Sequence, residues 1–400
     1  MNRELPLFPV SVVGSLPRGA GAQRALRDWA RGRTDHVDGQ AGDHAVLAAL
    51  ALQDGAGVDI VSDGEQRRDN FYSFLAEGVD GIRLLALSEL LNWVEDKAAF
   101  ERLLQALDVP AFAIRNPVVD GPLRRRRPLA AEEVRFVRAH TDRPVKVALP
   151  GPYLLTRSMW VKALSEEHYP TKESLGDDVV TLLRAELSDA IDAGADFVQL
   201  DEPVLTEVAF AGPHETHSFM CAALSEKASP EEELEFAVEL VNRVVEGFGA
   251  VRTGLHVCRG NWSQDEGVLL RGAYDPLVPY FARMRVDQLV LEYATERAGS
   301  LDALAELPAE LEIGLGVCDP RSAEVEDPAE MAGRVRELMV HRKPEKVFLN
   351  PDCGFGTFAE RPVNTSELAA AKLAGLHAAA ELLRAEHAGH PGPVLGAGRR

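Results

Sequence analysis

Residues 254–262 read GLHVCRGNW, an apolar run that leads directly into a polar, glycine-containing turn. Side chains alternate along a strand, so His256 and Cys258 point to the same side at the strand's end. A thiolate and an imidazole presented together are ligands that zinc takes in proteins. This stretch therefore predicts a strand that carries part of a metal site. The predicted fold depends on whether the same pattern, an apolar run followed by a polar turn, recurs along the chain.

The pattern of a short apolar run followed by a polar or glycine-rich turn recurs along the chain, near residues 10, 60, 147, 198, 255, 290, 315 and 348. Segments of helical length separate most of these runs, over residues 42–55, 176–193, 230–248, 328–342 and 366–386. Alternating strands and helices predict an α/β fold with a parallel sheet. Eight units most simply close into a (β/α)8 TIM barrel, with a doubly wound open sheet as the alternative. In both folds, functional residues gather at the carboxyl ends of the strands.

Residues 76–140 interrupt this pattern, and we expect them to form an excursion from the barrel. The excursion contains two predicted helices and one extended, proline-marked piece, over residues 97–107, 130–140 and 112–128. We expect a single catalytic barrel over residues 1–387. The glycine- and proline-rich tail, residues 388–400, is expected to be disordered.

The composition is that of a soluble globular protein with a net charge of −20. Nucleic acids and anionic membranes bind basic surfaces, so we expect neither as a partner. The basic run at residues 124–127 fits a solvated loop, with a phosphate-binding patch as the alternative. No apolar stretch approaches the ~18 residues of a membrane span, and the N-terminal segment lacks the apolar core of a signal peptide. We therefore expect a cytoplasmic protein.

The chain has four cysteines, too few for a disulfide framework: Cys221, Cys258, Cys318 and Cys353. In a reducing compartment, cysteines at strand ends are more often metal ligands or catalytic groups. Cys258 and Cys353 lie in turns rich in glycine and asparagine, whereas buried structural thiols more often lie within apolar runs. Cys318 also ends a predicted strand, and we interpret it as a packed thiol.

Four residues with zinc-binding side chains follow predicted strands and would meet at one mouth of the barrel: His256, Cys258, Glu292 and Cys353. Two thiolates, an imidazole and a carboxylate make a four-coordinate set of the catalytic kind, because the carboxylate can be displaced by an incoming ligand. Zinc also lowers the pKa of a bound thiol. The sequence therefore predicts Zn²⁺ as the cofactor and a thiol as the substrate.

Short motifs follow one another along the chain: VGSLP at 13–17, DGE at 63–65, LPGP at 149–152, QLDEP at 199–203, HVC at 256–258, LE at 291–292, GVCD at 316–319 and NPDCG at 350–354. In this order they resemble the catalytic barrel of cobalamin-independent methionine synthase. The combination of NPDCG, HVC and DEP is the specific part of the resemblance, which spans residues 10 to about 385. The porphyrinogen decarboxylases resemble the same barrel but do not use a zinc-thiol site.

The resemblance implies an activity and a set of roles. The activity is zinc-dependent methyl transfer to homocysteine, which is activated as a zinc thiolate and becomes methionine. The four predicted ligands match the zinc ligands of the family. The backbone of Ser15 matches the group that holds the substrate carboxylate, and Glu65 and Asp201 match the acidic residues that hold the amino group. The methyl donor implied is methyltetrahydrofolate or a corrinoid-type donor.

Two departures from the family pattern leave the donor open. Full-length enzymes of the family carry a second barrel, so this chain resembles the short, single-barrel members. The family has Asp-Ile-His-Ser at the seventh strand, where the histidine suits proton delivery to the leaving group. This chain has Asp319 and Arg321 in that motif, and we take these two residues as the catalytic candidates. Arginine stays protonated and makes a poor general acid, so a corrinoid-borne methyl group becomes more plausible.

Two other functions stay open. A zinc-thiol enzyme that alkylates a thiol with another electrophile, such as an epoxide, would use the same barrel. A non-catalytic module that binds a thiol or a corrinoid partner is the second alternative. The expected partners are a small thiol amino acid and a methyl donor, with a corrinoid protein and a homo-oligomer both compatible with the sequence.

Overall fold

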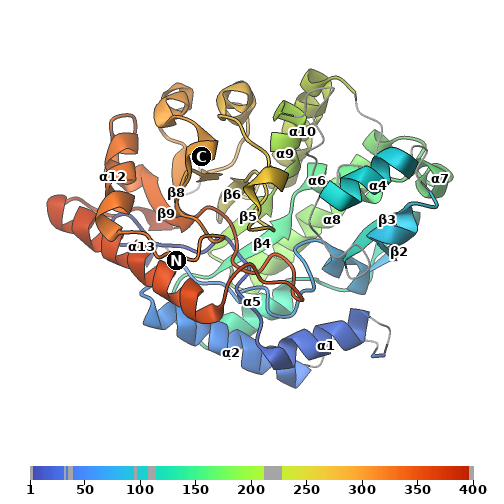
Figure 1. The fold of residues 1–400 in the computed structure, drawn as a ribbon, viewed down its shortest axis with the longest axis horizontal. Helices are drawn as coiled ribbons and strands as arrows, with labels where there is room; N and C mark the ends of the chain where they lie inside the picture. The colour runs from blue at the N-terminus through green and yellow to red at the C-terminus, as the bar shows by residue number, and fades with distance from the viewer. Residues whose placement is uncertain are drawn as a thin grey trace.

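The computed structural model of the chain describes residues 3–30, 33–34, 39–93, 97–106, 114–210 and 228–395. Strands lie at its centre and helices surround them (Figure 1). Of the sequence expectations, those for Cys221, for residues 107–113 and for residues 396–400 fall outside the described residues.

Six parallel strands form the continuous part of the central sheet: β4 (Lys146–Pro150), β5 (Phe197–Asp201), β6 (Arg252–Val257), β7 (Gln288–Glu292), β8 (Glu312–Cys318) and β9 (Val347–Pro351). Two further extended segments, near residues 10 and 60, join the two edges of this sheet. They do so through isolated parallel bridges that pair Val10 with Leu349, Ser11 with Ile60, and Val61 with Val145. Because the edges are joined, the predicted TIM barrel is confirmed and the open doubly wound sheet is excluded.

The barrel strands are buried along their whole length, as expected for strands covered on both faces. Some interior positions are nevertheless polar. Lys146 Nζ donates a hydrogen bond to Gln199 Oε1 (3.0 Å), and Gln199 Nε2 donates to Asp201 Oδ1 (2.7 Å). A polar path inside the barrel thus leads to the carboxyl end of β5.

The longer helices pack outside the strands: α1 (Ala20–Ala30), α2 (Gly39–Gly55), α5 (Ala131–Arg138), α8 (Lys172–Asp192), α10 (Pro230–Val245), α12 (Pro328–Met339) and α13 (Ser366–Glu386). Six of the seven helices predicted from the sequence are among them, and the seventh, near residues 97–107, is α4 (Lys97–Ala106) in the excursion. Helix α8 begins a turn earlier than predicted because Thr171 caps it, accepting a hydrogen bond from the Ser174 N–H. Helix α10 begins at the predicted proline, with Ser229 as its cap.

Shorter helical segments lie in the connections: α6 (Pro152–Met159), α7 (Lys162–Ser165), α9 (Val204–Phe210), α11 (Val278–Phe281), η1 (Ser73–Glu77), η2 (Glu266–Val268), η3 (Asp275–Leu277), η4 (Glu296–Ala298), η5 (Leu301–Glu306) and η6 (Pro344–Lys346). Several of them directly follow barrel strands, so they shape the mouth of the barrel. In the part of the chain that the structure describes, none of the helices has the length and apolar content that crossing a membrane requires.

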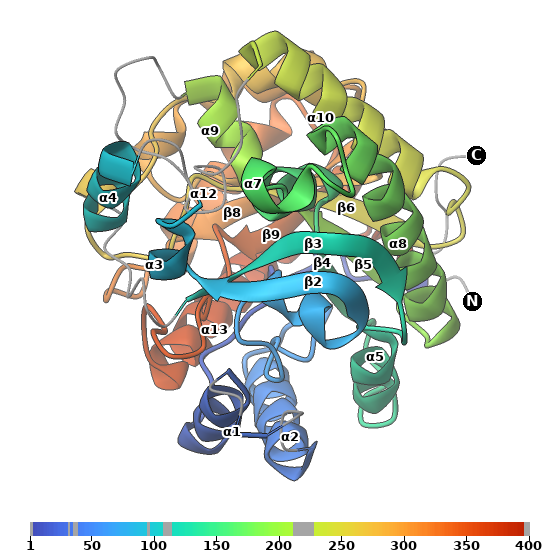
Figure 2. The ribbon, with the colours of Figure 1, turned by 90° about the vertical axis from the view of Figure 1, so that its right-hand side faces the viewer.

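The excursion forms an antiparallel hairpin of β2 (Val79–Ala86) and β3 (Arg115–Arg125), which crosses one side of the barrel (Figure 2). Two helices, α3 (Leu87–Leu90) and α4 (Lys97–Ala106), lie between its strands in the chain. The predicted extended piece became β3, whereas β2 was not predicted because its apolar residues do not alternate. The hairpin is anchored to the barrel by hydrogen bonds from Asn116 Nδ2 to the Ser158 carbonyl (2.8 Å) and from the Leu123 N–H to Tyr169 Oη (2.9 Å).

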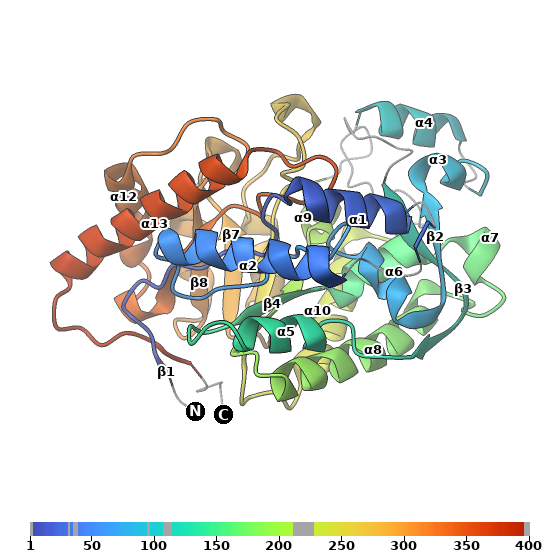
Figure 3. The same ribbon diagram turned by 90° about the horizontal axis from the view of Figure 1, so that it is seen from below.

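The structure describes the first part of the C-terminal tail, residues 388–395, for which the sequence predicts disorder. Val394–Leu395 form β10, which pairs in antiparallel fashion with β1 (Arg3–Glu4), so the first and the last segments that the structure describes lie side by side (Figure 3). Arg252 Nη2 also donates a hydrogen bond to the Val394 carbonyl (3.3 Å). Pairing with a distant segment supplies backbone hydrogen bonds that the tail's own sequence cannot.

Candidate metal centre and active site

Three of the predicted ligands meet at the carboxyl mouth of the barrel. His256 lies near the end of β6, Cys258 follows that strand, and Cys353 follows β9. One ligand atom from each residue lies within 4.8 Å of the others. His256 and Cys258 are 3% and 4% exposed, and Cys353 is partly buried. Strands that are distant in sequence therefore deliver three zinc-type ligands to one point.

The hydrogen bonds of His256 fit a metal ligand. Its Nδ1 faces the Val290 carbonyl at 3.2 Å, and because a carbonyl only accepts, Nδ1 carries the proton. Its Nε2 is buried and has no hydrogen-bond partner among the described residues. Ligating histidines are commonly oriented in this way by a second group. The free lone pair of Nε2 beside two thiols is a donor set that suits zinc.

The two thiols are electronically distinct. A hydrogen bond from Cys353, against the opposing effect of burial, lowers the pKa of Cys258, and His256 lowers it further. The same hydrogen bond and burial raise the pKa of Cys353. Cys258 therefore ionises before Cys353, and the thiolate is the form of cysteine that binds a metal.

Glu292, the predicted fourth ligand, is not brought into this group. It ends β7 and is fully buried, but other groups of the chain occupy its carboxylate. Oε2 accepts hydrogen bonds from the Arg259 backbone N–H (2.8 Å) and from Asn261 Nδ2 (3.2 Å), and Oε1 pairs with Arg297 Nη2. Although burial raises the pKa of Glu292, the guanidinium groups of Arg297 and Arg259 lower it below its usual range.

The three predicted ligands line one pocket. The predicted substrate-binding residues line the same pocket: Ser15, Glu65 and Asp201. The remaining lining residues are mostly apolar, aromatic or small: Val13, Phe71, Pro203, Gly260, Asn261, Trp262, Gly354, Thr357 and Phe358. The ligand group and the acidic residues therefore share one cavity.

Close contacts between loops place Ser15 and Glu65 in this pocket. A Cβ at Gly354 would lie 2.1 Å from Ser15 Oγ, and a Cβ at Gly14 would lie 2.2 Å from Glu65 Oε1, so glycine at both positions leaves room for these two side chains as they are placed. Glu65 itself has a φ of 53°, a left-handed conformation that residues other than glycine seldom adopt. Strained backbone of this kind is typical of functional sites.

Burial perturbs both acidic residues of the pocket. It raises the pKa of Glu65 to about 7 and the pKa of Asp201 to about 6. Glu65 Oε2 is buried without a hydrogen-bond partner among the described residues, whereas Asp201 is held by Gln199. Two buried carboxyl groups that lack a full set of partners can bind a cationic group such as an ammonium.

The predicted catalytic residues, Asp319 and Arg321, are not among the described residues that line the pocket. Arg321 is buried and its Nη2 donates to Asp319 Oδ2 at 3.0 Å. The same guanidinium pairs with Glu266, and its Nε donates to Asn261 Oδ1 at 3.0 Å. Asn261 lines the pocket, so one side chain lies between Arg321 and the pocket.

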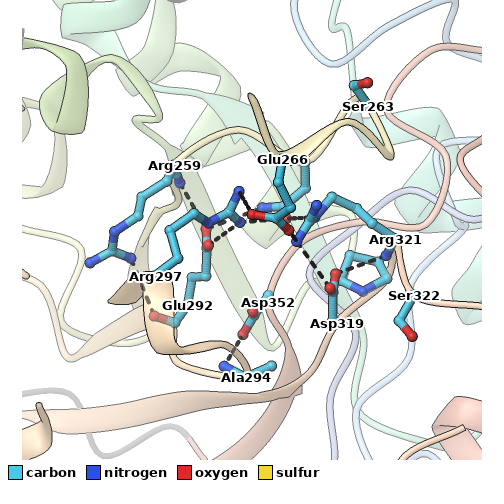
Figure 4. Close-up of polar contacts among 12 residues, drawn as sticks. Arg259, Ser263, Glu266, Glu292, Ala294, Arg297, Asp319, Arg321, Ser322 and Asp352 are labelled. Atoms are coloured by element: carbon cyan, nitrogen blue, oxygen red, sulfur yellow. Dashed lines mark hydrogen bonds and ion pairs between the residues drawn. The ribbon is translucent and has the colours of Figure 1, made fainter. Parts of the chain in front are cut away.

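Figure 4 shows these residues as one charged network, in which Glu266 lies between Arg297 and Arg321. Glu292 is bound by Arg259 and Arg297 on one side of the network, and Asp319 is bound by Arg321 on the other. Sequence reasoning missed Arg297 and Glu266. They lie in short 3-10 segments after β7 and β6, and no spacing rule relates such loop residues to a strand-end carboxylate.

Comparison with known proteins agrees with the class that fold and pocket define, a TIM barrel with a thiol and imidazole ligand group at the carboxyl ends of its strands. The family model described as "Cobalamin-independent synthase, Catalytic domain" matches residues 8–375. The chain belongs to this family, the cobalamin-independent methionine synthases.

The relatives are similar over nearly their whole length. A methionine synthase of Thermococcus kodakarensis is 30% identical over 385 residues, which is 96% of this chain and 95% of that protein. A methionine synthase of Saccharolobus solfataricus is 27% identical over 354 residues, 88% of this chain and 89% of that protein. The structure of a B12-independent methionine synthase from Shewanella, in complex with selenomethionine, has a TM-score of 0.71 at 22% identity and covers 95% of this chain and 99% of that one. This last likeness supports the fold.

Proposed function

We propose that this chain is a zinc-dependent methyltransferase that methylates the thiol of homocysteine to give methionine. The observation that carries the proposal is the shared pocket. His256, Cys258 and Cys353 lie within 4.8 Å of one another in a cavity that is also lined by acidic residues suited to an amino acid. Family membership supports the same reaction, since the relatives are methionine synthases.

The pocket residues would orient the amino-acid end of the substrate. Glu65 and Asp201, as carboxylates, attract its ammonium group, and the backbone N–H of Ser15 suits its carboxylate. The substrate sulfur then points toward the three ligands. A bound zinc ion would keep that sulfur deprotonated near neutral pH. Holding the nucleophile in one orientation is a large part of the rate enhancement in such two-substrate reactions.

Arg321 favours a donor whose leaving group needs no proton. Its guanidinium is bound to Asp319 and Glu266, and arginine does not give up its proton at physiological pH. An amine leaving group such as folate N5 requires protonation, whereas a corrinoid leaves as a stable reduced metal centre. We therefore place a corrinoid-borne methyl group before methyltetrahydrofolate as the donor, carried free or on a corrinoid protein.

The test combines metal analysis with an assay matrix. Purified protein from zinc-supplemented medium is expected to carry one zinc per chain and to methylate homocysteine from methylcobalamin faster than from methyltetrahydrofolate. Parallel reactions offer the same thiol with an epoxide. Protein without zinc, or thiol addition to the epoxide without methyl transfer from either donor, would contradict the proposed function.

A further inference from the structure

Gln199 is a buried amide that joins two walls of the pocket. It lies on β5, two residues before Asp201. Its Nε2 donates hydrogen bonds to Asp201 Oδ1 (2.7 Å) and to the Val13 carbonyl (3.0 Å). Asp201 and Val13 both line the pocket, and the chain runs from Val13 into Ser15. One amide group therefore ties the carboxylate proposed for the substrate ammonium to the segment proposed for the substrate carboxylate.

Lys146 extends this chain of hydrogen bonds into the interior of the barrel. It is buried at the start of β4, the strand that pairs with β5. Its Nζ donates to Gln199 Oε1 (3.0 Å) and lies 5.2 Å from the centre of the Phe197 ring. Lys146 is not among the described residues that line the pocket, so its effect on a ligand there is transmitted by its neighbours.

The chain of hydrogen bonds has one permitted direction. An ammonium group only donates, and a backbone carbonyl only accepts. Lys146 and Val13 therefore both favour the same orientation of the Gln199 amide, with its oxygen toward the lysine and its nitrogen toward Val13. In that orientation the second amide hydrogen faces Asp201, whose Oδ1 accepts it. The lysine at the base of the chain thus helps to set how the Asp201 carboxylate is held at the top.

Burial of Lys146 is unfavourable for the fold. It lowers the pKa of Lys146 to about 7, although the Asp201 carboxylate opposes this change. Because the folded chain holds this proton less tightly than the unfolded chain does, the lysine destabilises the protein at neutral pH. A methionine would fill similar space without a buried charge. A residue that lowers stability directly beneath a pocket indicates a functional role.

We propose that Lys146 is a positioning residue for the substrate ammonium group, which acts by orienting the Gln199 amide that holds Asp201. The inference rests on the proposed function, because it requires an amino acid in the pocket. Without Lys146, Gln199 Oε1 would be buried and unpaired, which is unfavourable. A rotation of the amide that relieved this would break its hydrogen bonds to Asp201 and Val13. The loss is therefore expected in recognition of the amino group and not in the stability of the fold.

The experiment compares homocysteine with 4-mercaptobutanoate, which is the same thiol acid without the amino group. Calorimetry measures the Kd of each ligand for the wild type, Lys146→Met, Gln199→Leu and the double variant. Both ligands share the thiol and the carboxylate, so the ratio of the two Kd values isolates the contribution of the amino group. We expect Lys146→Met to reduce the wild-type preference for homocysteine by about tenfold, the scale of a hydrogen bond to a charged group.

The double variant tests whether the effect of the lysine passes through the amide. In the Gln199→Leu background, Lys146→Met should cause no further change in the Kd ratio, because the group that transmits its effect is already absent. An unchanged ratio in the single variant Lys146→Met would overturn the inference. An equal loss in both backgrounds would overturn it as well, because the lysine would then act without Gln199.

The matched control is Lys172→Met, since Lys172 is a buried lysine on α8 that pairs with Glu233 of α10. It should leave the Kd ratio unchanged. Thermal unfolding is the second readout, and Lys146→Met should unfold at the same or a higher temperature than the wild type. A lower unfolding temperature together with an equal loss of both ligands would make Lys146 a structural residue and overturn the inference.

Failure of the proposed function would give a different result. A wild-type protein that binds homocysteine but methylates it from neither donor would contradict the proposed function. The Kd ratio depends on binding and not on methyl transfer, so it remains measurable in that case, and the two failures are distinguishable.

Discussion

Two groups of side chains lie next to each other at the mouth of this barrel, and they differ in whether the chain itself occupies the atoms that could bind a metal. In the thiol group, His256 Nε2 is buried and has no hydrogen-bond partner in the part of the chain that the structure describes. In the arginine network, Glu292 and Asp319 are paired with guanidinium groups. Because burying unpaired polar atoms is unfavourable, the first group indicates a missing ligand and the second a scaffold. The predictions below test this difference.

The largest effect is expected where the unsatisfied group loses a ligand. Cys353→Ser should reduce zinc affinity by more than about 100-fold, because 100-fold is the upper effect of losing a group that only supports a ligand. The rate of methyl transfer should fall by at least the same factor. Metal analysis after dialysis, with the assay, measures both. Cys318→Ser is the matched control, because Cys318 is a buried thiol at the end of β8 that does not belong to the ligand group. Similar losses in both variants would mean that the fold, and not the ligand, was damaged.

The acidic side of the pocket should show the next largest effect. Glu65→Gln removes a charge that faces the substrate ammonium, so the KM for homocysteine should rise by about 10- to 100-fold while zinc content stays constant. Steady-state kinetics measures the KM, and metal analysis measures the zinc content. Glu312→Gln is the control, because Glu312 is a buried carboxylate at the amino end of β8, where it pairs with Arg252. An unchanged KM in Glu65→Gln would remove this residue from the proposed substrate site.

The pH dependence should reflect the same carboxylate. Burial raises the pKa of Glu65 to about 7, so the group is charged above pH 7 and becomes neutral below it. The substrate ammonium is attracted only by the charged form, and the KM for homocysteine should therefore rise about tenfold as the pH falls from 8 to 6. Glu65→Gln should flatten this dependence. A KM that falls toward pH 6 would have the wrong sign for a carboxylate that binds a cation.

The smallest effect is expected in the arginine network. Arg321→His places an imidazole where the family has one, and it should raise the rate with methyltetrahydrofolate relative to methylcobalamin by about fivefold. This is below the ~100-fold of a well-placed general acid, because Asn261 separates residue 321 from the pocket. The ratio of the two rates in one preparation is the measurement. A ratio that stays constant would show that the proton supply does not depend on this position.

Much of the site could be predicted because it depends on local patterns. His256 and Cys258 share one face of β6 by strand alternation, and the carboxyl ends of parallel strands meet in any barrel. Glu292 could not be placed in the same way. Its position at the end of β7 was predicted correctly, but its partner, Arg297, lies on a loop whose path no local pattern specifies.

The sequence by itself determined the alternation of strands and helices, the starts of the capped helices and the residue types at the mouth of the barrel. Each of these depends on neighbours within about one turn or one strand. Only the tertiary structure decided the closure of the barrel through Val10, Ile60 and Val145, the pairing of β1 with β10, and the binding of Glu292 by Arg297. These features join segments far apart in the chain, and their hydrogen bonds and ion pairs exist only after the fold has brought the segments together.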